Sequence, residues 1–130
     1  MKNEFVTYEQ AVKLKGLGFD EKCMSFYAPL EPPRLTCIAF KDGQLDYSKV
    51  KNSHKLMGNG RVTAPLKQQV FRWFREKFNI DSHIEKYLSS EDAIEYFFMA
   101  NDKESVNFDT YEEANFACIN YLVSLIEAKN

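Results

Sequence analysis

The sequence predicts an α+β fold in which an antiparallel sheet of four to five strands packs against three helices. Apolar residues recur at helical spacing in three segments, and short β-prone runs follow one another between them. The turns between these runs are too short to join parallel strands. The predicted order of elements is α-β-β-(β)-α-β-β-α, and 130 residues are expected to form a single domain over residues 1–130.

The first helix is predicted over residues 7–17. Thr7 and Gln10 have the spacing of a capping box, in which a hydroxyl and an amide satisfy free backbone donors at a helix start. Gly18 permits the left-handed conformation that ends many helices. The apolar side of this helix is formed by Tyr8, Ala11, Val12, Leu14 and Leu17.

Two strands of a hairpin are predicted next, over residues 23–28 and 34–40. Both are apolar runs too short for a helix. The residues between them form an irregular connection, because proline cannot donate to a ladder and three prolines occur here, Pro29, Pro32 and Pro33.

A basic loop precedes the second helix. Asp42 and Gly43 predict a tight turn, and residues 44–48 a short additional strand. Residues 48–60 show no periodicity and are expected to form an exposed, mobile loop. It ends in GNGRVTAP, which is not a P-loop but places basic side chains near a helix N-terminus. An anionic ligand, either a nucleotide or a nucleic-acid backbone, would be held by Lys49, Lys51, His54, Lys55 and Arg61; the alternative is a solvated loop without a ligand.

The second helix has the clearest pattern. Thr63 and Pro65 are expected to mark its start, and Arg72 can pair with Glu76 one turn later. Burial of each large apolar side chain is worth roughly 1.5 to 3 kcal/mol, so the apolar stripe decides which side faces the core. The stripe consists of Leu66, Val70, Trp73, Phe74 and Phe78.

Two further strands are predicted over residues 82–88 and 94–100. The second strand, IEYFFMA, carries large side chains on both faces, with Ile94, Tyr96 and Phe98 on one and Phe97 and Met99 on the other. Either another part of the chain covers the second face, or Phe97 and Met99 form a binding surface or a dimer interface.

The last helix is predicted to begin at Asp109, with Glu112 as its partner in a capping box. Its buried stripe is predicted to consist of Tyr111, Ala114, Cys118, Tyr121, Leu122, Leu125 and Ile126.

Composition and spacing exclude several classes of protein. No stretch approaches the roughly 18 to 20 apolar residues of a membrane-spanning helix, and no signal peptide is recognisable, so a cytoplasmic protein without membrane association is expected. Cys23, Cys37 and Cys118 form no CxxC or Cys/His pattern, which predicts reduced thiols and no metal site. His54 and His83 lie in no catalytic motif, and Glu91, Asp92 and Glu95 suit a solvated turn, so no catalytic residue or cofactor is predicted.

The charge is distributed unevenly along the chain. Residues 1–80 contain fourteen Lys/Arg and eight Asp/Glu, whereas residues 81–130 contain three Lys/Arg and eleven Asp/Glu. Opposite fields on two faces can steer partners or stack copies of the chain head to tail. The alternative is that the two halves interleave in the fold and neutralise one another.

Three segments resemble a group of small proteins of unknown function from bacteriophages and prophages. They are FVTYEQAVKLKGLGFDEKC near the N-terminus, APLKQQVFRWFREKFNI in the middle and YEEANFACINYLVSLI at the end, of which the central one is the most specific. The resemblance implies a phage-type accessory protein. It implies no activity, cofactor or catalytic residue.

The leading hypothesis is a non-enzymatic accessory protein that acts by interaction with a protein partner or with copies of itself. The motivation is the absence of a catalytic motif together with an aromatic content of 15%, since interfaces use aromatic side chains as anchors. Two alternatives stay open. One is a binder of a nucleotide or nucleic acid through the basic loop, and the other is an enzyme of unrecognised type.

Overall fold

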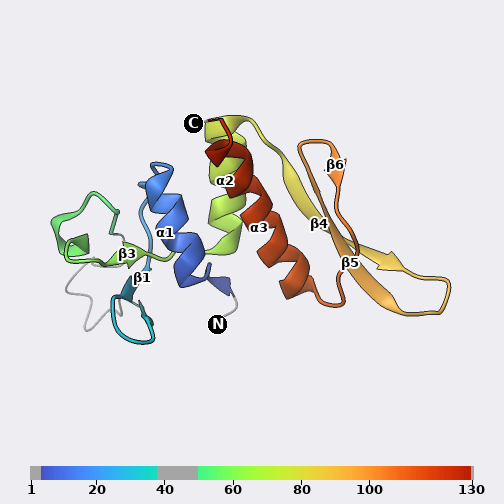
Figure 1. The fold of residues 1–130 in the computed structure, drawn as a ribbon, viewed down its shortest axis with the longest axis horizontal. Helices are drawn as coiled ribbons and strands as arrows, with labels where there is room; N and C mark the ends of the chain where they lie inside the picture. Colours follow the sequence, from blue (N-terminus) through green and yellow to red (C-terminus); the bar gives the residue numbers. More distant parts are fainter. Residues whose placement is uncertain (1–3, 38–49, 130) are drawn as a thin grey trace. The chain divides into compact units, whose positions relative to one another are not determined.

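The computed structural model describes residues 4–37 and 50–129 (Figure 1). The chain divides into two compact units, residues 1–66 (unit 1) and residues 67–130 (unit 2). The described residues form two three-stranded antiparallel sheets together with three α-helices. The α+β class is therefore confirmed. The single sheet of four to five strands is wrong, because no ladder between described residues joins the two sheets.

Helix α1 (Tyr8–Gly16) opens unit 1 and is capped at both ends as predicted. The Gln10 N–H donates to Thr7 Oγ1 at 3.2 Å, and the Thr7 N–H donates to Gln10 Oε1 at 3.1 Å. At the other end Gly18 has a φ of +94°, and the Phe19 N–H donates to the Leu14 carbonyl at 2.9 Å. This is a Schellman motif, and its apolar pair, Leu14 and Phe19, is buried.

The sheet of unit 1 has the strand order β2-β1-β3. Strand β1 (Ser25–Ala28) pairs with β2 (Arg34–Cys37), which confirms the predicted hairpin, and β3 (Val62–Thr63) pairs with the other side of β1. Thr63 therefore does not start the second helix as predicted, because its backbone belongs to a ladder with Phe26. The rest of the predicted second strand, residues 38–40, and the predicted strand 44–48 lie outside the described residues.

Three contacts hold the N-terminal segment of unit 1 to its sheet. The Tyr27 hydroxyl donates to the Val6 carbonyl, and the Val6 N–H donates to the Pro65 carbonyl at 3.1 Å. The ring of Tyr8 lies edge-on to that of Tyr27, with 5.7 Å between centroids. Because Val6 and Tyr27 are buried, these bonds satisfy polar groups that water cannot reach.

Unit 2 contains helix α2 (Lys67–Phe78) and the sheet β4-β5-β6. Strands β4 (Ser82–Leu88) and β5 (Ile94–Ala100) have the predicted bounds. The prediction missed β6 (Lys103–Glu104), which is too short for a periodic pattern. A two-residue turn at Asn101 and Asp102, with φ of +52° and +63°, joins it to β5, as expected of a type I′ hairpin.

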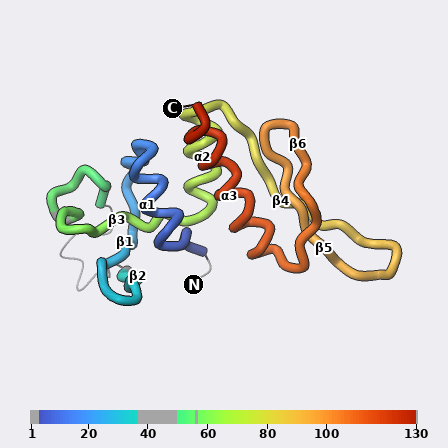
Figure 2. The backbone as a smooth tube through the Cα atoms, viewed as in Figure 1, coloured from blue at the N-terminus to red at the C-terminus, as the bar shows by residue number. Residues whose placement is uncertain are grey.

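Helix α3 (Tyr111–Glu127) covers one face of this sheet. Tyr121 lies against Phe98 with 5.6 Å between ring centroids, and Tyr111 against Tyr96 with 6.1 Å. Figure 2 shows α2 beside α3.

The start of α3 differs from the prediction by one residue. Its N-cap is Thr110, whose hydroxyl oxygen accepts from the Glu113 N–H at 3.1 Å, and not Asp109 with Glu112. Both pairs have the spacing of a capping box, so residue types alone do not distinguish them.

The predicted apolar stripe of α2 is buried in its central part, at Val70, Trp73 and Phe74. Leu66 and Phe78 are partly exposed, Leu66 precedes the helix, and Phe71, outside the predicted stripe, is also buried. Trp73 is 5% exposed, and its ring lies edge-on to Phe74 and Phe78 at centroid distances of 5.1 Å and 5.2 Å. On the exposed side of the helix, Arg72 Nε lies 3.9 Å from Glu76 Oε1, which is the ion pair that the sequence predicts.

We expect Trp73→Ala to lower the free energy of unfolding by roughly 3 to 5 kcal/mol, because loss of the indole leaves a cavity in unit 2. Urea unfolding followed by circular dichroism measures the change. Arg72→Ala is the matched control on the exposed side of the same helix and should change stability by about 0.5 kcal/mol or less. A loss below about 1 kcal/mol for Trp73→Ala would show that the indole contributes little to the core.

Candidate interaction surfaces

The side chain of Asn52 ties the basic loop to two other parts of unit 1. The Asn52 amide donates to the Phe19 carbonyl at 2.9 Å, and its oxygen accepts from the Thr63 N–H at 3.0 Å. The loop also contains a short 3-10 helix, η2 (Lys55–Met57), in which Met57 is buried. The segment 51–60 is mostly exposed, as expected of a loop, and hydrogen bonds between residues three apart form this one short helical turn in it.

The predicted anion-binding residues are distributed along this loop. Lys51, His54 and Lys55 are exposed, and Arg61 is partly exposed. Lys49 lies outside the described residues. The structure thus places four of the five residues on the segment 51–61, of which Asn52 fixes the beginning.

A carboxylate lies close to the same loop. Asp20 accepts from the Ser53 N–H at 2.7 Å. The Ser53 side chain lowers the pKa of Asp20 most, desolvation opposes this shift, and the Ser53 backbone bond and the charge of Lys51 lower the pKa further. The ionised Asp20 offsets part of the positive charge that the loop offers to an anion.

A second candidate surface lies at the end of the β4–β5 hairpin. Leu88 and Ile94 are direct cross-strand partners, and they are 67% and 55% exposed. They share the helix-covered face of the sheet with Tyr96, which touches Tyr111 at the start of α3. The hairpin continues past the start of α3, so the helix leaves its end uncovered (Figure 1). We call Leu88, Ile94, Tyr96 and Tyr111 the hairpin-end surface.

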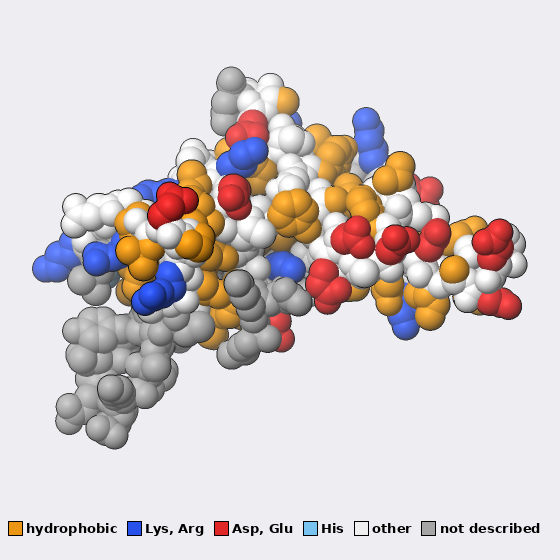
Figure 3. Space-filling view, turned by 60° about the horizontal axis from the view of Figure 1, so that its bottom comes forward, with side chains coloured by type: hydrophobic (Ala, Val, Ile, Leu, Met, Phe, Trp, Pro, Cys, Tyr) orange, Lys and Arg blue, Asp and Glu red, His pale blue; other side chains and the backbone are white. Residues whose placement is uncertain are grey.

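Acidic side chains lie at the turn next to the hairpin-end surface. Glu91 and Asp92 are exposed in the β4–β5 turn. Glu95 lies on the opposite face of β5, where it accepts from the Asn107 amide at 2.7 Å. Glu112 and Glu113 lie in the first turn of α3. Figure 3 shows acidic and apolar side chains next to one another over the right-hand part of the view, where unit 2 is drawn. Residues 67–130 contain twelve Asp/Glu against seven Lys/Arg.

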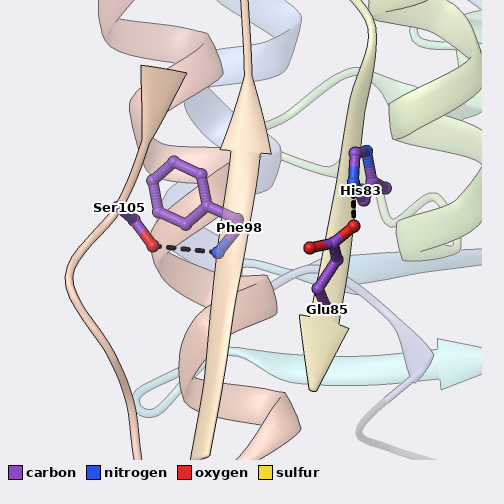
Figure 4. A network of polar contacts seen from close by, with 4 residues as sticks. All are labelled: His83, Glu85, Phe98 and Ser105. Atoms are coloured by element: carbon purple, nitrogen blue, oxygen red, sulfur yellow. Dashed lines mark hydrogen bonds and ion pairs between the residues drawn. The ribbon is translucent and has the colours of Figure 1, made fainter. Parts of the chain in front are cut away.

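Phe97 and Met99, the predicted interaction residues, lie on the opposite face of the hairpin. The register places them across from Glu85 and His83, whose side chains are hydrogen-bonded at 3.0 Å (Figure 4). Phe97 is only 8% exposed, so its ring is covered within the chain and is not an exposed anchor. Met99 is partly exposed, and its role at an interface stays a prediction.

The described thiols are poorly placed for nucleophilic chemistry. Burial raises the pKa of Cys118 to about 12, although the Ser82 side chain beside it acts in the opposite direction. The thiolate is the reactive form of cysteine, so this side chain is inert at neutral pH. Cys23 is also buried.

The described residues contain neither a metal-binding cluster nor a membrane-spanning helix. Between residues 4–37 and 50–129, no group of three or more His, Cys, Asp or Glu is placed to hold a metal ion. No helix in this part of the chain is long and apolar enough to cross a membrane.

Comparison of the chain with protein-family models, with curated proteins and with solved structures finds no match. The resemblance to phage and prophage proteins therefore rests on the three sequence segments alone. The function has to be argued from the surfaces themselves.

Leu88 and Ile94 are not among the interaction residues that the sequence predicts. A signal was present, because the two apolar residues end the predicted strands 82–88 and 94–100 and flank a short turn. Residues in these positions are cross-strand neighbours. The exposure of these two side chains depends on which part of the hairpin α3 covers, and the local sequence pattern does not predict this.

Phe97→Lys is expected to unfold unit 2, because a buried, unpaired charge costs several kcal/mol, comparable to the stability of a small domain. Thermal unfolding by circular dichroism measures this. Leu88→Lys is the control on the same hairpin and should leave the melting temperature nearly unchanged, since Leu88 is 67% exposed. A folded, stable Phe97→Lys variant would mean that the ring is accessible and would restore it as an interface candidate.

Proposed function

We propose that this chain is a non-enzymatic accessory protein that acts by binding another protein through the hairpin-end surface. The observation that carries the proposal is the exposure of Leu88 and Ile94, a cross-strand apolar pair that α3 leaves uncovered. Neighbouring apolar side chains exposed together are typical of interaction sites. Tyr96 and Tyr111 lie beside this pair, and tyrosine is enriched among the residues that contribute most to binding.

The charge around the surface indicates what kind of protein would bind. Glu91 and Asp92 are exposed in the turn that joins Leu88 to Ile94. A partner with an apolar centre and basic residues at its edge complements this arrangement in both respects. The phage-type role belongs to the same proposal and rests on the resemblance of the three sequence segments.

The double variant Leu88→Ser/Ile94→Ser tests the proposal. We expect it to stay folded, because both side chains are exposed, and to bind a partner at least about tenfold more weakly, a loss of about 1.4 kcal/mol. The full chain is first used to capture proteins from a bacterial lysate. The captured protein is then purified and titrated calorimetrically against each variant.

Leu30→Ser is the matched control, because Leu30 is an apolar residue of unit 1 with a similar exposure of 50%. It should bind the partner like the unmodified chain. Equal affinity of the unmodified chain and the double variant would contradict the role of the hairpin-end surface.

Binding of a nucleotide or nucleic acid by the basic loop is the second candidate function. The observation in its favour is the tether by Asn52, which fixes the backbone that carries Lys51, His54 and Lys55. A fixed backbone lowers the conformational entropy lost when an anion is bound. Asp20 argues in the opposite direction, since its carboxylate lies within the electrostatic reach of Lys51.

Replacing Lys49, Lys51, Lys55 and Arg61 together by Ala should abolish nucleic-acid binding, because phosphate contacts supply most of its free energy. The melting temperature should stay close to that of the unmodified chain. Electrophoretic mobility shift at low and high salt is the measurement, with Lys13→Ala/Lys15→Ala on α1 as the control for exposed charge elsewhere in unit 1. If the unmodified chain shows no salt-sensitive binding to single-stranded or double-stranded nucleic acid, this version of the function is wrong.

A further inference from the structure

One long side of β4 has no neighbouring strand among the described residues, because the order of the sheet is β4-β5-β6. Tyr96 exchanges two backbone hydrogen bonds with Phe108, at 2.8 Å and 2.6 Å, and the Ser105 N–H donates to the Phe98 carbonyl at 2.9 Å. The even-numbered residues of β5 therefore direct their backbone groups away from β4. Backbone groups alternate in direction along a strand, so the odd-numbered residues of β5 bond to β4.

The register extends this alternation to β4. Phe97 pairs with Glu85 and Met99 with His83, so the odd-numbered residues of β4 bond to β5. The even-numbered residues direct their N–H and C=O groups outwards, and we call this side the outer edge: Ser82, Ile84, Lys86 and Leu88.

The outer edge has the properties of a strand that accepts another strand. It is seven residues long and contains neither proline nor glycine. Its register with β5 is continuous, without a bulge. Natural proteins usually protect such an edge with charged residues, proline or a bulge. Among the four residues whose backbone groups face outwards, Lys86 is the one with a charged side chain.

We infer that a second copy of this chain adds its own β4 to the outer edge, antiparallel and centred on Ile84. In such a dimer, a two-fold axis perpendicular to the sheet passes between the two strands, and the residue at the axis lies opposite the same residue of the other copy. Three residues can occupy this position while at least five residues of each β4 are paired: Ile84, Glu85 and Lys86. Centring on Glu85 opposes two carboxylates, and centring on Lys86 opposes two ammonium groups. Like charges directly across a ladder are destabilising, which leaves Ile84.

The pairing centred on Ile84 is complementary on both faces of the extended sheet. It sets Glu85 of each copy opposite His83 of the other, and these two side chains already hydrogen-bond within one strand at 3.0 Å. It sets Lys86 opposite Ser82, which carries no charge. The outward groups of Ser82, Ile84 and Lys86 then form roughly six backbone hydrogen bonds across the axis.

The association is expected to be weak. A pairing of five residues buries less surface than the roughly 1,200 Å² of a stable interface, so the dimer should form in a concentration-dependent way. The hairpin-end surface is not needed for this pairing, and the two proposals can fail independently.

Sedimentation velocity of the full chain over a concentration series, from about 10 µM to about 1 mM, tests the inference in the range of weak association. The weight-average mass should rise from 15.2 kDa towards twice that value. Lys86→Pro removes the outward N–H without removing a β4–β5 hydrogen bond and should keep the protein monomeric. Lys86→Ala retains the N–H and is the matched control, which should dimerise.

A charge exchange tests the register without altering the backbone. Glu85→Arg removes the acceptor that faces the imidazole of His83 in the second copy and should weaken dimerisation at least about tenfold, whereas the double variant His83→Glu/Glu85→Arg sets opposite charges across the ladder and should recover it. Ile94→Ser should dimerise like the unmodified chain, which separates the outer edge from the hairpin-end surface. A monomer at every concentration, equal dimerisation of Lys86→Pro and Lys86→Ala, or no recovery in the double variant would overturn the inference.

Discussion

The packing of α3 on one face of the β4–β5 hairpin decides what unit 2 buries and what it exposes. Ring contacts of Tyr121 with Phe98 and of Tyr111 with Tyr96 attach the helix to β5, the central strand. The helix begins at Tyr111, and the β4–β5 hairpin continues beyond this residue without a helix over it. The exposed pair of Leu88 and Ile94 is therefore a consequence of where the helix begins, as is the acidic first turn that lies close to it.

A comparable constraint operates in unit 1 through the side-chain amide of Asn52. This amide bonds both to Phe19, just after α1, and to Thr63 in β3, so it fixes the beginning of the basic loop against these two segments. Each of these bonds is worth about 1 kcal/mol in a folded protein. Their larger effect is geometric, because they fix where the following residues, including Lys55, lie relative to Asp20 and Ser53.

Local patterns predicted most elements of the fold. The capping box of α1, the stripe of α2 and the bounds of β4 and β5 all depend on residues close together in the sequence. Two strands, β3 and β6, were not predicted. Each has two residues and forms because a neighbouring strand is present to pair with it. For the same reason the division into two sheets could not be read from strand-like runs, since it depends on which strand pairs with which. The cap of α3 was wrong because Asp109 and Thr110 both have a glutamate at the required spacing.

The candidate site was predicted less well than the fold because burial is set by tertiary packing. Phe97 and Met99 share a face in the sequence pattern, yet Phe97 is buried. Leu88 ends the predicted strand 82–88 and is the most exposed member of the hairpin-end surface. Alternation predicts which side chains lie on one face, but it does not predict which part of that face another element covers.

The two surfaces proposed for unit 2 are compatible with one another. The outer edge would be recognised through backbone groups, whereas the hairpin-end surface would be recognised through side chains. A two-fold axis perpendicular to the sheet keeps the helix-covered faces of both copies on the same side and directs the two hairpin ends in opposite directions. A dimer of this kind would present two equivalent acidic and apolar surfaces at its ends. Weak pairing at β4 would then strengthen binding to a partner that carries repeated sites, because the second contact becomes intramolecular.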